Sequence, residues 1–201
     1  YAMPSPSDHS PAPTIFLVDD DVSFLRSLSR FLRAAGLRVV VHNSAAEFLG
    51  DLKADINGCV ITDLKMPGMD GMGLQRALQQ AGSPLPILFL SAHGDIPSTV
   101  QAMRGGAEDF LTKYAPKEDL LAAVKRALAR NELNRAERAH LQALRRPFES
   151  LTEREREVLR LVVQGKMNKE IAADLNIHER TVKLHRTHIT IKLGVRSVAE
   201  L

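Results

Sequence analysis

Aspartates stand at the ends of two short apolar runs in this chain. Asp19 and Asp20 follow Ile15 to Val18, and Asp63 follows Cys59 to Thr62. Apolar runs of this length that alternate with helical patterns are typical of parallel strands, whose ligands bind at the carboxyl ends of the strands. We therefore expect the three carboxylates to share one crevice. Because three negative charges repel each other, a divalent cation and an ammonium group are expected to neutralise them.

Two further polar residues end apolar runs later in the chain. Lys113 comes after Asp109 to Thr112, and Ser91 ends the run that begins at Ile87. The Lys113 ammonium would neutralise the carboxylates, and the Ser91 hydroxyl is suited to donate a hydrogen bond to a phosphate oxygen. A single Asp or Ser at a strand end often caps the next helix instead, but capping does not explain all five residues together.

The expected crevice suits phosphoryl transfer to a carboxylate. Magnesium takes one or two carboxylates together with phosphate oxygens, which Asp20 and Asp63 could supply directly and Asp19 through water. An aspartate beside such a metal can attack a phosphoryl group and form an acyl phosphate. We predict this role for Asp63, which stands alone at the end of the third strand.

Five strands and five helices are expected to position these residues. Helical patterns alternate with the apolar runs, and the first helix, Val22 to Ala34, has apolar residues at three-and-four spacing. Right-handed crossovers would join such units into a doubly wound parallel sheet, an α/β fold. The apolar runs are Thr14 to Val18, Leu37 to Val41, Gly58 to Thr62, Ile87 to Ser91 and Ala107 to Leu111.

The remainder of the chain is predicted to be all-α. Glu118 to Arg146 contains neither Gly nor Pro, which predicts one long helix that Pro147 ends and whose second half is a solvated linker. A coiled coil is an alternative, although the heptads are irregular. A capping box starting at Thr152 opens a compact helical module, with helices to Val163, from Asn168 to Leu175 and from Arg180 to Leu193. Ser197 begins a fourth helix that we expect to be cut short at Leu201.

The last two complete helices form a helix-turn-helix pattern, in which the second helix enters the major groove of DNA. At 100° per residue one face of that helix is apolar, and the opposite face carries Lys183, Leu184, Thr187 and Ile191. Leu184 and Ile191 would be unexplained by packing but could contact thymine methyl groups. The residues expected to reach phosphates are Lys169, Arg180, Lys183 and Lys192.

Charge and composition agree with two different domains. The 201 residues hold 27 Lys and Arg against 24 Asp and Glu. Residues up to Arg130 carry about one excess negative charge and those after it about four excess positive charges, which is typical of a nucleic-acid-binding module. Cys59 has no second cysteine to pair with, and no apolar run is long enough to cross a bilayer, so we expect a cytoplasmic protein that does not bind membranes.

The first part of the chain resembles the receiver domain of bacterial two-component response regulators. The resemblance rests on Asp19-Asp20, "TDLKMPGMDG" around Asp63, "FLSAHGD" from Phe89 and "EDFLTK" ending at Lys113. It implies a flavodoxin-like fold with strand order 2-1-3-4-5 and Asp63 as phospho-acceptor. By the same resemblance Asp19 and Asp20 bind Mg²⁺, the Lys65 backbone carbonyl is a further ligand, and Ser91 with Phe110 forms the switch pair.

The last part resembles the LuxR-type DNA-binding domain of the NarL/FixJ class. The motifs are "NKEIA", "TVKLH" and "KLGV", and "AHGDIP" in the receiver points to the FixJ subgroup. The resemblance places Lys183, Leu184 and Thr187 against bases. It also implies a sensor histidine kinase and double-stranded promoter DNA as partners, a homodimer on activation, and RNA polymerase as a further candidate. Four segments are expected: a disordered start (1–13), the receiver (14–130), a helical linker (131–150) and the DNA-binding domain (151–201).

Two alternatives stay open at this stage. A phosphatase of the haloacid dehalogenase type would use Asp19 as nucleophile within Asp19-Asp20-Asp21 and would leave Asp63 idle. A DNA-binding protein whose receiver takes no phosphate is the second, because the family usually has a cis Lys-Pro bond where this chain has Lys113-Tyr114. Either a strained cis bond persists there, or the loop is trans and the ammonium is aimed differently.

Overall fold

The computed structural model describes residues 12–53, 56–92 and 95–195. The chain divides into two compact units, Tyr1–Arg135 and Ala136–Leu201, and the division falls inside one helix, α5 (Lys117–Glu149). Within the described ranges, no helix is both long enough and apolar enough to span a bilayer. The predicted fourth helix of the C-terminal module, from Ser197, lies outside the described residues.

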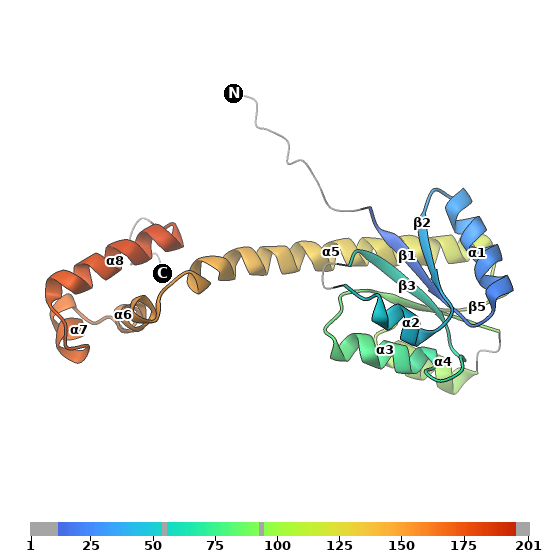
Figure 1. Ribbon diagram of the computed structural model, residues 1–201, viewed down its shortest axis with the longest axis horizontal. Helices are drawn as coiled ribbons and strands as arrows, with labels where there is room; N and C mark the ends of the chain where they lie inside the picture. Colours follow the sequence, from blue (N-terminus) through green and yellow to red (C-terminus); the bar gives the residue numbers. More distant parts are fainter. Residues whose placement is uncertain (1–11, 54–55, 93–94, 196–201) are drawn as a thin grey trace, which may run out of the picture. The chain divides into compact units, whose positions relative to one another are not determined.

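The first unit is built on a five-stranded parallel sheet with the order β2-β1-β3-β4-β5 (Figure 1). This confirms the predicted doubly wound fold and its strand order. Every residue of β3 and β4 is buried, as expected for inner strands of a parallel sheet with helices on both faces. The strands are β1 (Thr14–Val18), β2 (Arg38–His42), β3 (Gly58–Asp63), β4 (Ile87–Ser91) and β5 (Asp109–Thr112).

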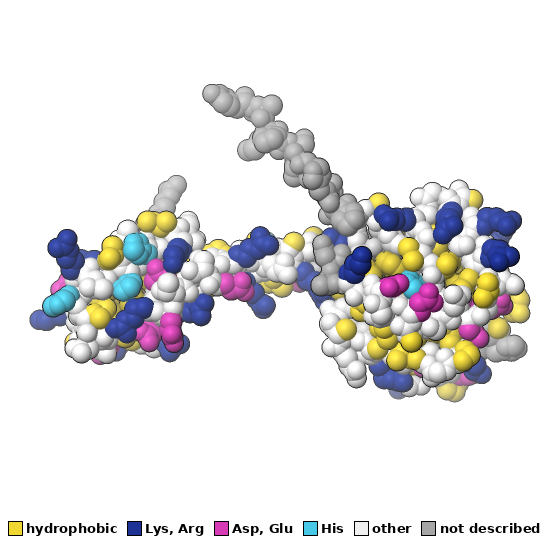
Figure 2. All heavy atoms as spheres, viewed as in Figure 1, with side chains coloured by type: hydrophobic (Ala, Val, Ile, Leu, Met, Phe, Trp, Pro, Cys, Tyr) yellow, Lys and Arg dark blue, Asp and Glu magenta, His cyan; other side chains and the backbone are white. Residues whose placement is uncertain are grey.

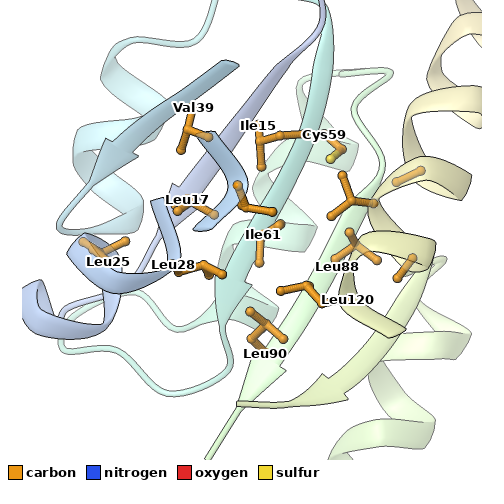
Figure 3. Close-up of a cluster of buried hydrophobic side chains, with 14 residues drawn as sticks. Ile15, Leu17, Leu25, Leu28, Val39, Cys59, Ile61, Leu88, Leu90 and Leu120 are labelled. Atoms are coloured by element: carbon orange, nitrogen blue, oxygen red, sulfur yellow. The ribbon is translucent and has the colours of Figure 1, made fainter. Parts of the chain in front are cut away.

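Two apolar layers hold the helices of this unit to the sheet. Helix α1 and the start of α5 cover one face, where Leu28 and Leu120 pack with strand residues such as Ile61 (Figure 3). The other face packs α2, α3 and α4, around fully buried Phe48 and Phe89. The helices are α1 (Val22–Ala34), α2 (Ala45–Gly50), α3 (Gly71–Gln80) and α4 (Ile96–Arg104). Because both faces are covered, the ends of the strands are where a crevice can open.

The long helix predicted after Pro116 is present but does not stop at Pro147. Helix α5 continues to Glu149, so Pro147 lies in its last turn. Proline lacks an N–H and so removes one helical hydrogen bond, but its own carbonyl can still accept one. That carbonyl accepts a hydrogen bond from the Ser150 hydroxyl at 2.6 Å, and the Ser150 N–H donates to Arg146. The helix therefore ends two residues later than the sequence suggested.

Among the described residues, the second unit contains three short helices after α5, namely α6 (Glu153–Val163), α7 (Asn168–Asp174) and α8 (Glu179–Leu193). The predicted capping box is present, because the Thr152 hydroxyl accepts from the Glu155 N–H while the Glu155 carboxylate accepts from the Thr152 N–H. The turn between α7 and α8 places Asn176 at a φ of 51°, a left-handed conformation that asparagine tolerates better than most residues. The buried core of this unit consists of Leu151, Val158, Ile171, Val182 and Ile189.

Candidate functional site

The aspartates after the strands separate into helix caps and pocket residues. Asp21 caps α1 by accepting hydrogen bonds from the Ser23 and Phe24 N–H groups. By contrast, Asp19, Asp20 and Asp63 cap no helix, and one carboxylate oxygen of each lies within 4.8 Å of the others. We call these three residues and Lys113 the acidic pocket. Its members come from the carboxyl ends of β1, β3 and β5, the edge of the sheet that the sequence predicted.

Lys113 is the cation of the acidic pocket. Its ammonium nitrogen lies 2.6 Å from Asp19 Oδ2 and 2.9 Å from Asp63 Oδ2. The Phe24 ring lies beneath it, 4.4 Å from nitrogen to ring centre, so the lysine is held by an aromatic face as well. Burial lowers the pKa of Lys113, but the two carboxylates outweigh burial and the pKa is raised. The lysine is therefore charged at neutral pH.

Asp19 is the most buried carboxylate of the acidic pocket, with 3% of the residue exposed. Burial raises its pKa, and the negative charge of Asp63 adds to that effect. The Lys113 ammonium and the Asp21 N–H, which donates to Asp19 Oδ1 at 2.9 Å, act in the opposite direction but do not cancel it. Burial is thus the main reason that the pKa of Asp19 lies above that of an ordinary aspartate.

The backbone beside Asp63 depends on a glycine that the sequence reasoning did not single out. The loop after β3 closes with the Gly71 N–H donating to Leu64 O at 3.0 Å. A Cβ atom added to Gly71 would lie 2.3 Å from the backbone oxygen of Asp63. The Leu64 N–H in turn donates to Asp63 Oδ1 at 2.6 Å. Gly71, the last residue of "KMPGMDG", therefore allows the close approach that orients Asp63.

The other predicted pocket residues lie around this centre. Ser91 is buried at the end of β4, and its backbone carbonyl accepts from the Lys113 N–H at 2.9 Å. Phe110 is half-buried on β5 and stacks on Phe89, with ring centres 5.9 Å apart. Lys65 is exposed two residues beyond Asp63. The four side chains of the acidic pocket thus lie together as their positions after the strands predicted, whereas Gly71 had no such signal in the sequence.

The second unit presents an exposed face on α8. Lys183 and Thr187 are exposed on it, and Leu184 and Ile191 are 53% and 72% exposed. Val182 and Ile189 on the opposite face are buried in the domain core. The helix-turn-helix geometry and its uncovered apolar residues are thus as the helical periodicity predicted.

The predicted basic residues of this unit differ in their surroundings. Lys169 on α7 and Arg180 on α8 are exposed. Lys183 pairs with Glu179, one turn earlier on the same helix, at 3.3 Å. Lys192 is exposed too, but its ammonium lies 2.7 Å from Oε2 of the buried Glu155 carboxylate. Figure 2 shows lysine and arginine side chains on the surface of this unit.

Comparisons with known proteins match each of the two units to a family. Residues 15–125 match the family described as "Response regulator receiver domain", and residues 149–201 match "Bacterial regulatory proteins, luxR family". The chain belongs to the response regulators of the NarL/FixJ type. Among curated proteins, this response regulator is 44% identical to the response regulator protein TmoT of Ectopseudomonas mendocina over 93% of the chain and 85% of that protein. It is 38% identical to the transcriptional regulatory protein FixJ of Azorhizobium caulinodans over 93% of the chain and 89% of that protein.

Solved structures share the fold of this response regulator over both units. The response regulator StyR is 44% identical, with a TM-score of 0.79 over 94% of this chain and 96% of that one. Full-length FixJ from B. japonicum is 35% identical, with a TM-score of 0.58 over 94% of this chain and 93% of that one. The family therefore implies a histidine kinase as the partner of the receiver and DNA as the partner of the LuxR-type domain.

The geometry of this response regulator bears on both alternatives left open by the sequence. A haloacid dehalogenase site would need Asp21 in the pocket, and Asp21 caps α1 instead. Among the described residues no peptide bond is cis, so the Lys113–Tyr114 bond is trans. The Lys113 ammonium nevertheless reaches two pocket carboxylates, while the Tyr114 side chain is 82% exposed. The missing proline therefore does not aim the lysine away from the pocket.

Proposed function

We propose that Asp63 accepts a phosphoryl group from a sensor histidine kinase and that this modification controls promoter binding by α8. The observation that carries the proposal is the Lys113 ammonium lying between Asp19 and Asp63, at 2.6 and 2.9 Å. A lysine shared by two carboxylates can bind an oxygen of a phosphoryl group attached to one of them. The proposal assigns the receiver to residues 14–130, the linker to 131–150 and the DNA-binding domain to 151–201.

The chemistry of the transfer is a displacement at phosphorus. A carboxylate oxygen of Asp63 forms the new O–P bond while the P–N bond to the kinase histidine breaks, and the imidazole nitrogen leaves with the electron pair. In this proposal, Lys113 and the Ser91 hydroxyl bind oxygens of the transferred group. Apart from slow self-catalysed phosphorylation and dephosphorylation of Asp63, we expect no enzyme activity.

The donor set of the acidic pocket fits Mg²⁺. Three carboxylates with oxygens within 4.8 Å and one ammonium leave two negative charges, which a divalent cation would neutralise. We propose Asp19, Asp20, Asp63 and the Lys65 backbone carbonyl as the residues that hold it. The bound ion would supply charge neutralisation for the incoming phosphoryl oxygens. Asp20 is exposed, so the pocket is open to solvent and to a phospho-donor on that side.

The switch is proposed to run from Ser91 to Phe110. When the Ser91 hydroxyl turns toward the new phosphoryl group, the space behind it becomes available to an aromatic side chain. Phe110 lies on the neighbouring strand β5 and is stacked on the buried Phe89. Its inward movement would change the surface of β5 and α4, where we place the dimer contact made on activation.

On the DNA side, exposure and charge favour Lys169, Arg180 and Lys183 as phosphate contacts. Lys183, Leu184 and Thr187 are proposed to face base edges in the major groove. A two-fold dimer would bind half-sites about 34 Å apart, one turn of the duplex. RNA polymerase is proposed as a further partner of the DNA-bound dimer.

Beryllofluoride, a mimic of the phosphoryl group, tests the proposal when it is added with Mg²⁺ to the full chain. DNA affinity of the wild-type chain is expected to rise, because the mimic engages Asp63. The Asp63→Asn variant is expected to keep its fold and its basal DNA binding and to lose the response. Asp119→Asn, an exposed residue of α5 outside the pocket, is the matched control and should respond like the wild type. DNA binding that never responds to beryllofluoride would instead support a receiver that takes no phosphate.

A further inference from the structure

One buried carboxylate of the second unit is not explained by DNA contact. Glu155 lies in the first turn of α6, and only 3% of the residue is exposed. Its Oε2 accepts hydrogen bonds from the Thr152 N–H and from the Lys192 ammonium, both at 2.7 Å. His188 Nδ1 lies 3.8 Å from the other oxygen. Both side chains come from the C-terminal half of α8, the helix that presents the DNA-binding face.

Lys192 makes two contacts in this arrangement, although a third of its side chain is exposed. Besides its bond to Glu155, its ammonium donates to the backbone carbonyl of Ser150 at 3.1 Å. Ser150 follows the last residue of α5, and Thr152 is the cap of α6. One lysine therefore joins the C-terminal half of α8 to the junction between α5 and α6. A phosphate that drew this ammonium away from Glu155 would break both bonds.

The N-terminal half of α8 is held differently. Arg186 donates to the side-chain oxygen of Asn168 at 2.9 Å, which links the middle of α8 to the start of α7. Lys183 has only an exposed partner on its own helix. The two lysines thus occupy different environments, although sequence spacing alone had assigned both to phosphates.

We propose that Lys192 and Glu155 form a positioning pair, which fixes the angle at which α8 presents Lys183, Leu184 and Thr187, and that Lys192 contacts no phosphate. This inference rests on the proposed DNA-binding role of α8 and deepens it. The direction in which DNA affinity changes when Glu155 is replaced distinguishes a positioning role from a purely electrostatic one. Removing a negative charge from a protein that binds DNA should strengthen binding if electrostatics alone acts. A positioning role requires the opposite, because the loss of Glu155 releases the C-terminal half of α8.

The test uses the full chain with beryllofluoride and Mg²⁺, and a duplex selected from a random library by the wild-type chain. Affinity is measured over a range of salt concentrations for Glu155→Gln, Lys192→Met and the double variant. Lys183→Met is the matched lysine control. A lost phosphate contact lowers the salt dependence, log Kobs against log[salt], by about 0.9. A lost positioning residue lowers affinity without changing that slope.

We expect Glu155→Gln and Lys192→Met each to weaken binding by about tenfold or more, with the wild-type salt slope. The double variant should bind DNA less tightly than the wild type. Its loss of affinity should not exceed that of the single variant that binds more weakly, because the two residues act as a pair. Lys183→Met should have a shallower slope. If a single variant fails to fold because it leaves one charge buried and unpaired, the double variant decides, since it removes both charges.

Three outcomes would overturn the inference. They are tighter binding by Glu155→Gln, a slope shallower by about 0.9 in any variant lacking Lys192, and wild-type affinity in the double variant. Failure of the wild-type chain to select any duplex would instead contradict the proposed function and remove the basis of the inference with it. The two failures are thus distinguished by the wild-type measurement.

Discussion

Lys113 of the receiver and Lys192 of the DNA-binding unit each contact a buried carboxylate, but the two clusters differ in net charge. Each ammonium lies within 3 Å of a buried carboxylate, at 2.6 Å from Asp19 and 2.7 Å from Glu155. Around Lys113 three carboxylates share one lysine, so two negative charges remain. Around Glu155 one carboxylate meets one lysine and a backbone N–H, and no charge remains.

The difference separates a functional cluster from a structural one. A balanced buried pair needs no further ligand, and removing one member leaves an unpaired charge. An unbalanced cluster is unfavourable unless something else binds, and a divalent cation supplies the charge that is missing. The sum of charges is therefore a better guide to a binding site than the presence of a buried ion pair.

The largest expected effect that tests this comparison is on stability, through Lys113→Met and Lys192→Met. Each should lower the free energy of unfolding by about 3 kcal/mol in the presence of EDTA, because each leaves a buried carboxylate unpaired. Mg²⁺ should recover part of the loss for Lys113→Met, since the cation can replace the ammonium, and none of it for Lys192→Met. Both free energies can be measured by urea unfolding in which the transitions of the two units are resolved. An equal response of the two variants to Mg²⁺ would contradict the difference between a cation-binding cluster and a balanced ion pair.

The pH dependence of stability should carry the signature of Glu155. Hydrogen bonds from Lys192 and from the Thr152 N–H outweigh burial and lower the pKa of Glu155 to about 2, against 4.5 for an ordinary glutamate. A pKa lowered by folding stabilises the protein above pH 4.5, and this contribution is lost as the pH falls toward 2. We expect the second unit to lose about 2 kcal/mol over this range.

The Glu155→Gln variant is the control for that measurement. Its second unit should show a flatter pH profile than the wild type, because it has no carboxylate to protonate at this position. Identical acid profiles of the two proteins would show that the pair contributes nothing to stability.

Alanine in place of Gly71, whose backbone packs against Asp63, should destabilise the receiver more than alanine in place of Gly50. Gly71→Ala would place a Cβ 2.3 Å from the Asp63 carbonyl, and we expect a loss of about 1 to 2 kcal/mol together with slower phosphorylation. Gly50, the last residue of α2, has no atom within 4 Å of an added Cβ. Gly50→Ala is therefore expected to be neutral or to stabilise by about 0.5 kcal/mol. Thermal unfolding compares them, and equal effects would count against a close approach at Gly71.

The smallest expected effect concerns the DNA face. Lys183→Ala should weaken DNA binding by about 1 kcal/mol, because an exposed lysine loses its phosphate or base contact. The slope of log Kobs against log[salt] should become shallower by about 0.9, the value for one phosphate contact. Fluorescence anisotropy with a labelled duplex at several salt concentrations measures both quantities. Unchanged affinity at moderate salt would remove Lys183 from the interface.

Local signals in the sequence predicted much of the architecture. Strand periodicity and the polar residues that follow each strand predicted the sheet and the acidic pocket, because parallel strands bring their carboxyl ends together. The Thr152 capping box and the exposed face of α8 follow from spacing along one helix, which needs no tertiary information.

What the sequence could not predict depends on contacts between distant residues. The partner of Lys192 lies 37 positions away on another helix, and helical periodicity describes only one helix at a time. Gly71 matters because of a backbone oxygen in a different element. The end of α5 was misjudged because a proline in the last turn removes only one hydrogen bond.

The most direct test of the central claim is the site of phosphorylation. The full chain is incubated with acetyl phosphate, with Mg²⁺ or with EDTA, and its peptides are examined by mass spectrometry. The account predicts one phosphoryl group on the peptide that contains Asp63, formed with Mg²⁺ and lost in EDTA. A phosphoryl group on Asp19 instead, or labelling that is indifferent to Mg²⁺, would contradict the account.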